Sequence, residues 1–471
     1  MLMSDLLDRP SPDSPSGAGF AAPLQASATA RRTVSDLLDR PSPDSPPGAG
    51  FAAPLQASAT AHRTVSDLLD RPSPDSLSGA GFAAPLQASA TARRTASDLI
   101  LYRLHNQHLL SPGADPAADL CGLQAQFLRN AVHALRIRSH EVFVDDLVKT
   151  WTLRGTVHLV PERDLPVYIR HCGGAEDVCQ SGWYQWTAGR NQANPPEREI
   201  ELARLTLAAI AGGVDEREAL RLHLRSCGMT EQEEARVFNP WGGMIAELAN
   251  IGALAFRVEV EHRSTSGSNC MQLRSIASTQ PCAEGWPEVD MLDDLCPVET
   301  KRYRLLAPFE PMEEGAARLE LARRYFTHYG PATLRDAAYF FHWTQAELKA
   351  LLARLPVETV VADGKTYFYL PNGEPARDLP EVILLAGFDP LMMGYRKEDN
   401  PVLPPEHLRG IFNLAGIVNP AILLHGRVVG KWKEKDGVVS LTAFELIPDV
   451  DRKRIVEEVI RLFIPKKIKW I

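Results

Sequence analysis

The ten residues TLRGTVHLVP, at positions 152–161, decide the class of fold. Val157–Val160 form a β-branched and apolar run that predicts a strand. Three helical stretches are expected before it: one capped by Ser97, a second at about 117–136 and a third at about 141–151. Three helices followed by a strand is the order of a winged helix-turn-helix unit.

The same order recurs twice further along the chain. Helices are predicted at about 197–211, 215–226 and 241–253, ahead of strands in ALAFRVEVE (253–261) and CMQLRSI (270–276).

The third round starts with two capping boxes, TLRD at 333–336 and TQAE at 344–347, each of which predicts a short helix. VETVVADGKTYFYL, at 357–370, then predicts a hairpin that turns at Asp363-Gly364. The remaining chain predicts strands in the segments 381–396, 421–434 and 438–448 and a closing helix at Asp451–Phe463.

We therefore predict an α+β fold with three tandem winged helix-turn-helix units, at 97–175, 176–307 and 308–375, and a β-rich C-terminal domain at 376–471. Residues 1–96 consist largely of three near-identical copies of a 31-residue unit rich in Pro, Ser, Ala and Gly. Such a unit cannot bury enough apolar surface to offset its chain entropy, so we predict a disordered tail.

Composition excludes several classes of protein. The net charge of −8 excludes a protein held to nucleic acid by global positive charge. The seven cysteines show no zinc-binding spacing and suit reduced thiols in a cytoplasm. With no signal peptide and no apolar run of the ~20 residues that a membrane span needs, we expect a cytoplasmic protein that is nucleoid-associated when bound to DNA.

Positive charge is concentrated locally. No acidic residue occurs between Asp119 and Glu141, and a helix there would place Arg129, His133 and Arg136 on one face. Such a strip suits phosphate contacts, although a solvated helix face explains it about equally well. The segment also holds Arg138 and His140.

Two glutamines lie in GLQAQFLRN, at 122–130. Gln124 and Gln126 would point to nearly opposite sides of a helix but to the same side of an extended chain. If both act on one substrate, the chain must leave helix at Gly122–Gln126, where the glycine allows a break. LQA alone means little, because it occurs once in each tail repeat.

Several segments together carry a family resemblance. They are GLQAQ at 122–126, WTLRGTVHLVPERDL at 151–165, RRYFTHYGPATLRDAAYF at 323–340, LLAGFDPLMMGYR at 384–396 and LLHGRVVGKWK at 423–433. In this order they resemble the winged-helix DNA glycosylase family typified by AlkZ and YcaQ, over about 97–464.

The resemblance implies removal of alkylated bases from double-stranded DNA, in some members including interstrand cross-links, with Gln124 and Gln126 as the Gln-x-Gln catalytic motif. It implies a barrel-like form for the β-rich C-terminal domain. It also implies a monofunctional hydrolase, here taken as a monomer with no cofactor and no metal. Glutamine is a poor general base, but an N7-alkylpurine is already a cationic leaving group. The amides then need only orient a water and stabilise a cationic sugar.

The candidate DNA-binding residues are Arg129, Arg136, Arg138, Arg154, His158, Tyr395 and Arg396. For His158 and Asp389 a structural hydrogen bond is the favoured role, and for Arg154 a phosphate and an acidic partner are equally good readings. Trp151, Trp183, Tyr184 and Trp186 could stack on a displaced base, but core packing is favoured. The alternative function is a non-catalytic winged-helix DNA-binding or regulatory protein.

Overall fold

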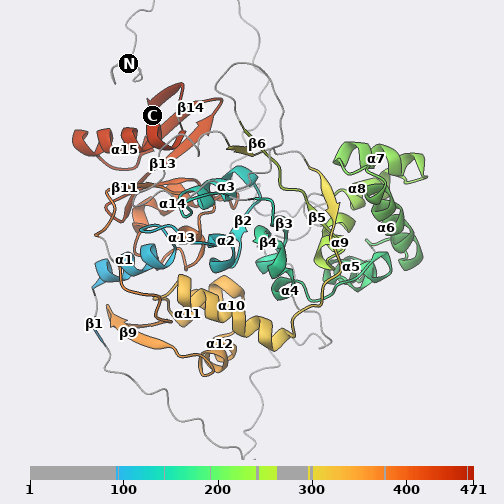
Figure 1. The fold of residues 1–471 in the computed structure, drawn as a ribbon, viewed down its shortest axis with the longest axis horizontal. Helices are drawn as coiled ribbons and strands as arrows, with labels where there is room; N and C mark the ends of the chain where they lie inside the picture. The colour runs from blue at the N-terminus through green and yellow to red at the C-terminus, as the bar shows by residue number, and fades with distance from the viewer. Residues whose placement is uncertain are drawn as a thin grey trace, which may run out of the picture.

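The computed structural model describes residues 92–93, 95–142, 144–190, 192–239, 243–262, 295–297, 301–375, 378–463 and 465–471 (Figure 1). The predicted disorder of the tail up to residue 91, and the predicted strand at 270–276, lie outside these residues. Ala92–Arg93, which we had placed in the disordered tail, form the short strand β1.

The first helix starts earlier than predicted. α1 covers Ala96–Asn106, and its N-cap is Thr95 rather than Ser97. Thr95 Oγ1 accepts from the Asp98 N–H at 3.2 Å, and Asp98 Oδ2 accepts from the Thr95 N–H at 2.8 Å. This reciprocal capping box stabilises the helix start more than a lone serine would.

The single helix expected at 117–136 is two helices separated by a strand. α2 is Pro116–Asp119, β2 is Leu123–Gln124 and α3 is Leu128–Arg136. The helix expected at 141–151 is wrong, because Leu147–Trp151 form the strand β3. β3 then pairs antiparallel with β4, Val157–Pro161, where the strand was predicted.

The second unit contributes both a helical lobe and strands to the first sheet. The sheet order is β2-β4-β3-β5-β8, with β5 at Leu254–Phe256 and β8 at Tyr303–Leu305. Figure 1 shows the lobe helices to one side of the molecule. They are α5 (Gly182–Ala188), α6 (Pro196–Ala211), α7 (Arg217–Ser226), α8 (Glu231–Val237) and α9 (Met244–Asn250). A separate pair, β6 (Val260–His262) and β7 (Leu295–Pro297), is antiparallel.

The third unit contains the two short helices and the hairpin that the sequence predicts. α10 (Glu314–His328) precedes α11 (Leu334–Phe341) and α12 (Gln345–Leu352), and both expected capping boxes are present. β9 (Glu358–Ala362) and β10 (Lys365–Tyr369) form the hairpin, with positive φ at Asp363 and Gly364. β1 adds parallel to β9.

The C-terminal domain is β-rich, but its described strands form an open sheet and not a closed barrel. The order is β11-β12-β13-β14-β15, so β11 and β15 are its edges. The strands are β11 (Val382–Leu384), β12 (Ala421–Leu424), β13 (Arg427–Lys435), β14 (Val438–Ala443) and β15 (Lys467–Trp470). Short helices α13 (Pro390–Met393) and α14 (Leu408–Ile411) precede the closing helix α15 (Asp449–Phe463).

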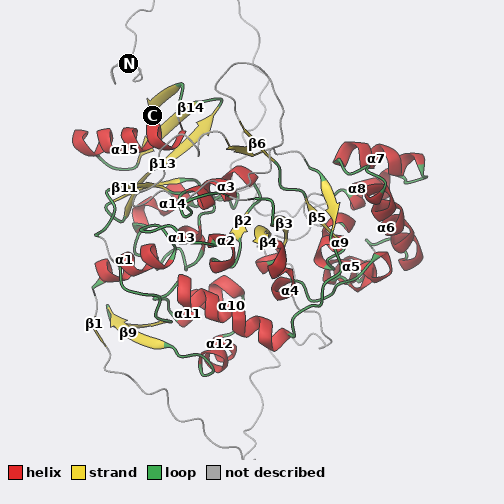
Figure 2. Ribbon diagram, viewed as in Figure 1, coloured by secondary structure: helices red, strands yellow, loops and turns green. Residues whose placement is uncertain are grey.

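Figure 2 shows helices and strands mixed through the fold. Among the described residues, the largest hydrophobic core joins the first unit, the third unit and the C-terminal domain, for example through Leu123, Tyr325 and Leu384. A second core lies in the helical lobe, around Leu202 and Leu224. A small third cluster packs α1 against the hairpin of β9 and β10. Within the described residues, no helix is long and apolar enough to cross a membrane.

Candidate active site

A tight turn delivers the chain from α2 into the extended segment with the two glutamines. Cys121 and Gly122 have φ of 56° and 84°, and the Gly122 N–H donates to Ala117 O at 2.8 Å. A Cβ on Gly122 would lie 2.7 Å from Val160 Cγ1, so glycine is required for two reasons. The predicted departure from helix at Gly122–Gln126 is confirmed, since β2 starts at Leu123.

The two amide side chains meet on one side of this segment. Gln124 Nε2 donates to Gln126 Oε1 at 3.3 Å, while Ala125 between them is fully buried in the core. Gln124 is buried and Gln126 is half-buried. Gln124 Oε1 is a buried acceptor with no hydrogen-bond partner among the described residues. Because such an atom costs about 1–3 kcal/mol, the arrangement keeps an acceptor ready for a ligand.

His158 lies opposite Gln124 in the β2–β4 pairing and is buried. Its Nδ1 lies 2.9 Å from Thr152 Oγ1 and 3.1 Å from Thr156 O, and its Nε2 accepts from Arg154 Nη2 at 3.3 Å. Burial, together with the Arg154 charge, lowers the pKa of His158 to about 3. The ring is therefore a neutral, buried hydrogen-bonding group that cannot reach DNA, which corrects its assignment as a DNA contact and supports the structural role.

Arg154 is a half-buried cation held over an aromatic ring. It has φ of 59°, donates from Nη1 to Phe340 O at 3.1 Å, and places its guanidinium 4.6 Å from the centre of the Phe340 ring. No acidic side chain of the described residues lies within 4.0 Å of it. Of the two readings of Arg154, the absence of such a partner in this part of the chain favours a phosphate contact.

The cationic strip expected on α3 is divided by burial. Arg129 is exposed and Arg136 is half-buried, but His133 is buried and stacks on Phe463. Burial lowers the pKa of His133 to about 4, and its Nε2 lies 2.7 Å from Leu384 O. His133 therefore anchors α3 to the C-terminal sheet and adds no positive charge near neutral pH.

Arg138 and Tyr395 are wrong as DNA contacts, because both side chains are completely buried. Arg138 makes a bidentate ion pair with Asp389, at 3.1 and 2.6 Å. Asp389 also caps α13, so its favoured structural role is confirmed. Tyr395 donates its hydroxyl to Tyr329 O at 2.9 Å.

Arg396 remains accessible and half-buried. Its Nη1 lies 3.2 Å from Asp399 Oδ2, and its backbone N–H donates to Asp336 Oδ1 at 3.1 Å. The residue thus stays a candidate for DNA contact, although a carboxylate already accompanies its charge.

A basic groove of about 850 Å³ opens next to the glutamine segment, between α3 and the C-terminal sheet. Its cationic side chains are Arg129, Arg136, Lys431, Lys433 and Lys466, against one acidic side chain, Glu434. The three lysines have no carboxylate within 4.0 Å among the described residues. Sequence inspection missed this groove because only the fold brings β13, β14 and the segment around Lys466 next to α3.

Phe127 is the aromatic residue that the sequence analysis overlooked. It follows Gln126 directly, is 41% exposed, lines the groove and leans on Phe388 with ring centres 6.4 Å apart. The aromatic candidates in the lobe are less suited: Trp151 packs on the lobe core, Tyr184 is buried, and Trp186 lies under Arg190. The Trp183 side chain lies outside the described part of the structure. In the sequence, the feature that could have indicated Phe127 is a large aromatic residue directly after the two glutamines.

Comparisons with known proteins place the chain in a family. A protein-family model described as DNA glycosylase AlkZ-like matches residues 117–463. A curated relative from Streptomyces sahachiroi, named an interstrand DNA cross-link repair glycosylase, is 26% identical over 382 residues, which cover 74% of this chain and 90% of the relative. The solved structure of Streptomyces sahachiroi DNA glycosylase AlkZ matches with a TM-score of 0.54 and 21% identity, over 80% of this chain and 100% of that chain, and so shares the fold. Since the matched family covers well over half of its length, the chain belongs to the AlkZ-like DNA glycosylase family.

Proposed function

We propose that this DNA repair glycosylase is monofunctional and removes N7-alkylated or other bulky alkylated purines from double-stranded DNA, including purines held in an interstrand cross-link. Family membership favours a glycosylase over a non-catalytic DNA-binding or regulatory protein. The name of the Streptomyces sahachiroi relative supports cross-links as substrates.

The proposed reaction is hydrolysis of the bond between C1′ and N9. The bonding electron pair moves to the purine, which neutralises the positive charge that alkylation placed on its ring. The sugar becomes oxocarbenium-like, a water oxygen adds to C1′, and the water loses one proton to the solvent. The products are an abasic site and the alkylated base. Because the leaving group is already cationic, this step needs neither an acid catalyst nor a Lewis acid.

The observation that carries this proposal is the shared orientation of Gln124 and Gln126. The unpartnered Oε1 of Gln124 can accept a hydrogen bond from the attacking water, and its dipole favours positive charge on the nearby sugar. Gln126 fixes the Gln124 amide through the 3.3 Å hydrogen bond, which keeps that oxygen directed at the site.

We propose that the basic groove, with Arg129, Arg136 and Arg154, contacts the DNA backbone and that Phe127 fills the space left by a displaced base. The units at 97–175, 176–307 and 308–375 would then be winged-helix modules, acting in a monomer. Their support is the helix-then-hairpin order of the first and third units.

The deciding experiment incubates the purified protein with a duplex containing N7-methylguanine, and with an N7-linked interstrand cross-link, and measures released base by mass spectrometry. We expect base release by the wild type and its loss in Gln124→Ala and Gln126→Ala. The matched control is Gln185→Ala, which should keep base release because Gln185 is an exposed glutamine of the lobe. A protein that binds these duplexes and releases no base would support the non-catalytic alternative.

A further inference from the structure

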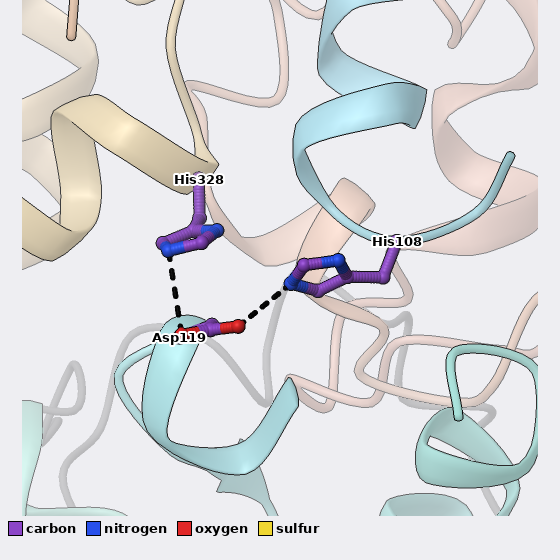
Figure 3. A group of neighbouring side chains, drawn as sticks. All are labelled: His108, Asp119 and His328. Atoms are coloured by element: carbon purple, nitrogen blue, oxygen red, sulfur yellow. Dashed lines mark hydrogen bonds and ion pairs between the residues drawn. The ribbon is translucent and has the colours of Figure 1, made fainter. Parts of the chain in front are cut away.

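Three side chains from distant parts of the sequence meet beside the turn that leads to Gln124 (Figure 3). His108 follows α1, Asp119 ends α2 and His328 ends α10. His108 Nε2 lies 2.8 Å from Asp119 Oδ2, and His328 Nε2 lies 3.4 Å from Asp119 Oδ1. All three potential ligand atoms lie within 4.8 Å of one another.

The surrounding backbone fixes how both imidazoles are presented. His328 Nδ1 lies 3.1 Å from Asn106 O, so this nitrogen donates its proton there and the Nε2 lone pair faces Asp119. Histidines that ligate metals are commonly held by such a bond to a carbonyl. His108 has φ of 60°, and a Cβ on Gly113 would lie 2.6 Å from its ring, so the ring packs against glycine backbone.

The contact between His328 and Asp119 suits a cation. A carboxylate that faces the Nε2 lone pair of His328 at 3.4 Å is repulsive unless a proton or a metal ion lies between them.

The site is also reachable and favourably placed. The side chains of His108, Asp119 and His328 are 14%, 31% and 10% exposed, so an ion can enter from solvent. His328 is the last residue of the 15-residue helix α10, whose C-terminal dipole favours a positive charge.

We propose that His108, Asp119 and His328 bind one divalent transition-metal ion, with Zn²⁺ as the preferred occupant. Two imidazole nitrogens and a carboxylate oxygen are a donor set that Zn²⁺ takes, with solvent as a fourth ligand. Ligand atoms about 2.1 Å from a tetrahedral Zn²⁺ lie roughly 3.4 Å apart, close to the separation of His328 and Asp119. The ion links the ends of α1, α2 and α10, and it so stabilises the turn at Cys121 and Gly122 that follows α2.

The test uses the full-length protein without a histidine tag, stripped by a chelator and titrated with Co²⁺ and then Zn²⁺. Calorimetry and the visible absorption of Co²⁺ report stoichiometry and geometry without reference to base release. We expect one ion per chain and a rise in the midpoint of thermal unfolding of a few degrees at saturating Zn²⁺, on the order expected for ligand linkage.

Variants decide whether these residues hold the ion. We expect His108→Gln and His328→Gln each to weaken binding by at least about 10-fold, as loss of a metal ligand requires. The control is His425→Gln, because His425 Nε2 lies 3.6 Å from Asp451 Oδ1 in a pair without a second histidine. Absence of binding by the wild type up to millimolar Co²⁺, or equal affinity in all variants, would overturn the proposal and leave a protonated His328–Asp119 pair.

Discussion

At the scale of single residues, the two glutamines differ in burial and therefore in how well each position tolerates a carboxylate. Gln124 is 7% exposed and its amide oxygen is enclosed, whereas Gln126 is half-buried. A carboxylate at the half-buried position has a smaller desolvation cost and places a full negative charge near the developing sugar cation.

This difference gives a prediction for two substitutions. We expect Gln126→Asp to retain base release or raise it, by up to about 10-fold, because the added charge stabilises the transition state. We expect Gln124→Asp to lose most activity, because the shorter, buried carboxylate is displaced and costly to ionise. Single-turnover rates on N7-methylguanine duplex measure both, and equal losses in the two variants would contradict these unequal roles.

Burial of His133 predicts a pH dependence of stability. Its pKa is about 4 in the folded protein and about 6.5 when unfolded, so below pH 6.5 only the unfolded chain takes up the proton. Its contribution to stability is thus present above pH 6.5 and falls as the pH falls towards 4, by about 2 kcal/mol between pH 7 and pH 5.

The glutamine of the variant His133→Gln does not titrate. In urea unfolding, the free energy of unfolding should therefore fall between pH 7 and pH 5 by about 2 kcal/mol less in this variant than in the wild type. The control is His425→Gln, whose ring is exposed. If the free energy of unfolding fell by the same amount between pH 7 and pH 5 in His133→Gln and in the wild type, His133 would be protonated in the folded protein.

At the scale of elements, the position of Gln124 depends on the turn between α2 and β2. We expect Gly122→Ala to destabilise the fold by more than about 1–2 kcal/mol, because alanine disfavours φ of 84° and its Cβ meets Val160. Base release should fall with it. The control is Gly213→Ala, because Gly213 has φ of 90° but no atom within 4 Å of an added Cβ. It should lose only the stability that the unfavourable backbone conformation costs, and base release should be unchanged.

The buried pair of Arg138 and Asp389 predicts a different result. We expect Asp389→Asn to destabilise the protein by about 3 kcal/mol or more, because it leaves a completely buried guanidinium without its counter-charge. Chemical unfolding measures this loss. A folded Asp389→Asn variant of normal stability that binds DNA less tightly would instead place the pair at the DNA interface.

Local signals explain which elements could be predicted from sequence. The capping boxes at Thr333 and Thr344 and the turn at Asp363-Gly364 specify their elements within a few residues, so those predictions are confirmed. Leu147–Trp151 has no such signal. Its apolar residues fit a helix or a strand, and pairing with β4 decides for the strand.

At the scale of the whole molecule, the sites that could not be predicted from the sequence are those that the fold assembles from distant segments. The motif at Gln124 and Gln126 could be identified because its residues are adjacent and the ordered motifs support it. The basic groove joins α3 to residues about 300 positions later, and the cluster of His108, Asp119 and His328 spans 220 positions. The absence of zinc-like spacing in the sequence therefore did not test for the metal site proposed above.

The groove predicts how DNA affinity depends on salt. We expect Lys431→Ala and Arg129→Ala each to weaken binding to any duplex and to reduce the slope of log affinity against log salt by about 1, since each removes one phosphate contact. Fluorescence anisotropy at several salt concentrations measures the slope. The control Arg204→Ala removes an exposed arginine already paired with Glu176 in the lobe, and should leave it unchanged.

The central claim is that two neutral amides on an extended segment catalyse release of an alkylated base. Its most direct test is the single-turnover rate of N7-methylguanine release by wild type and by Gln124→Ala, under saturating enzyme and with unfolding midpoints and duplex affinities measured in parallel. We predict a rate about 100-fold lower for Gln124→Ala, the usual cost of losing one preorganised group, with near-normal stability and affinity. An unchanged rate in a folded, DNA-binding Gln124→Ala protein would contradict the account.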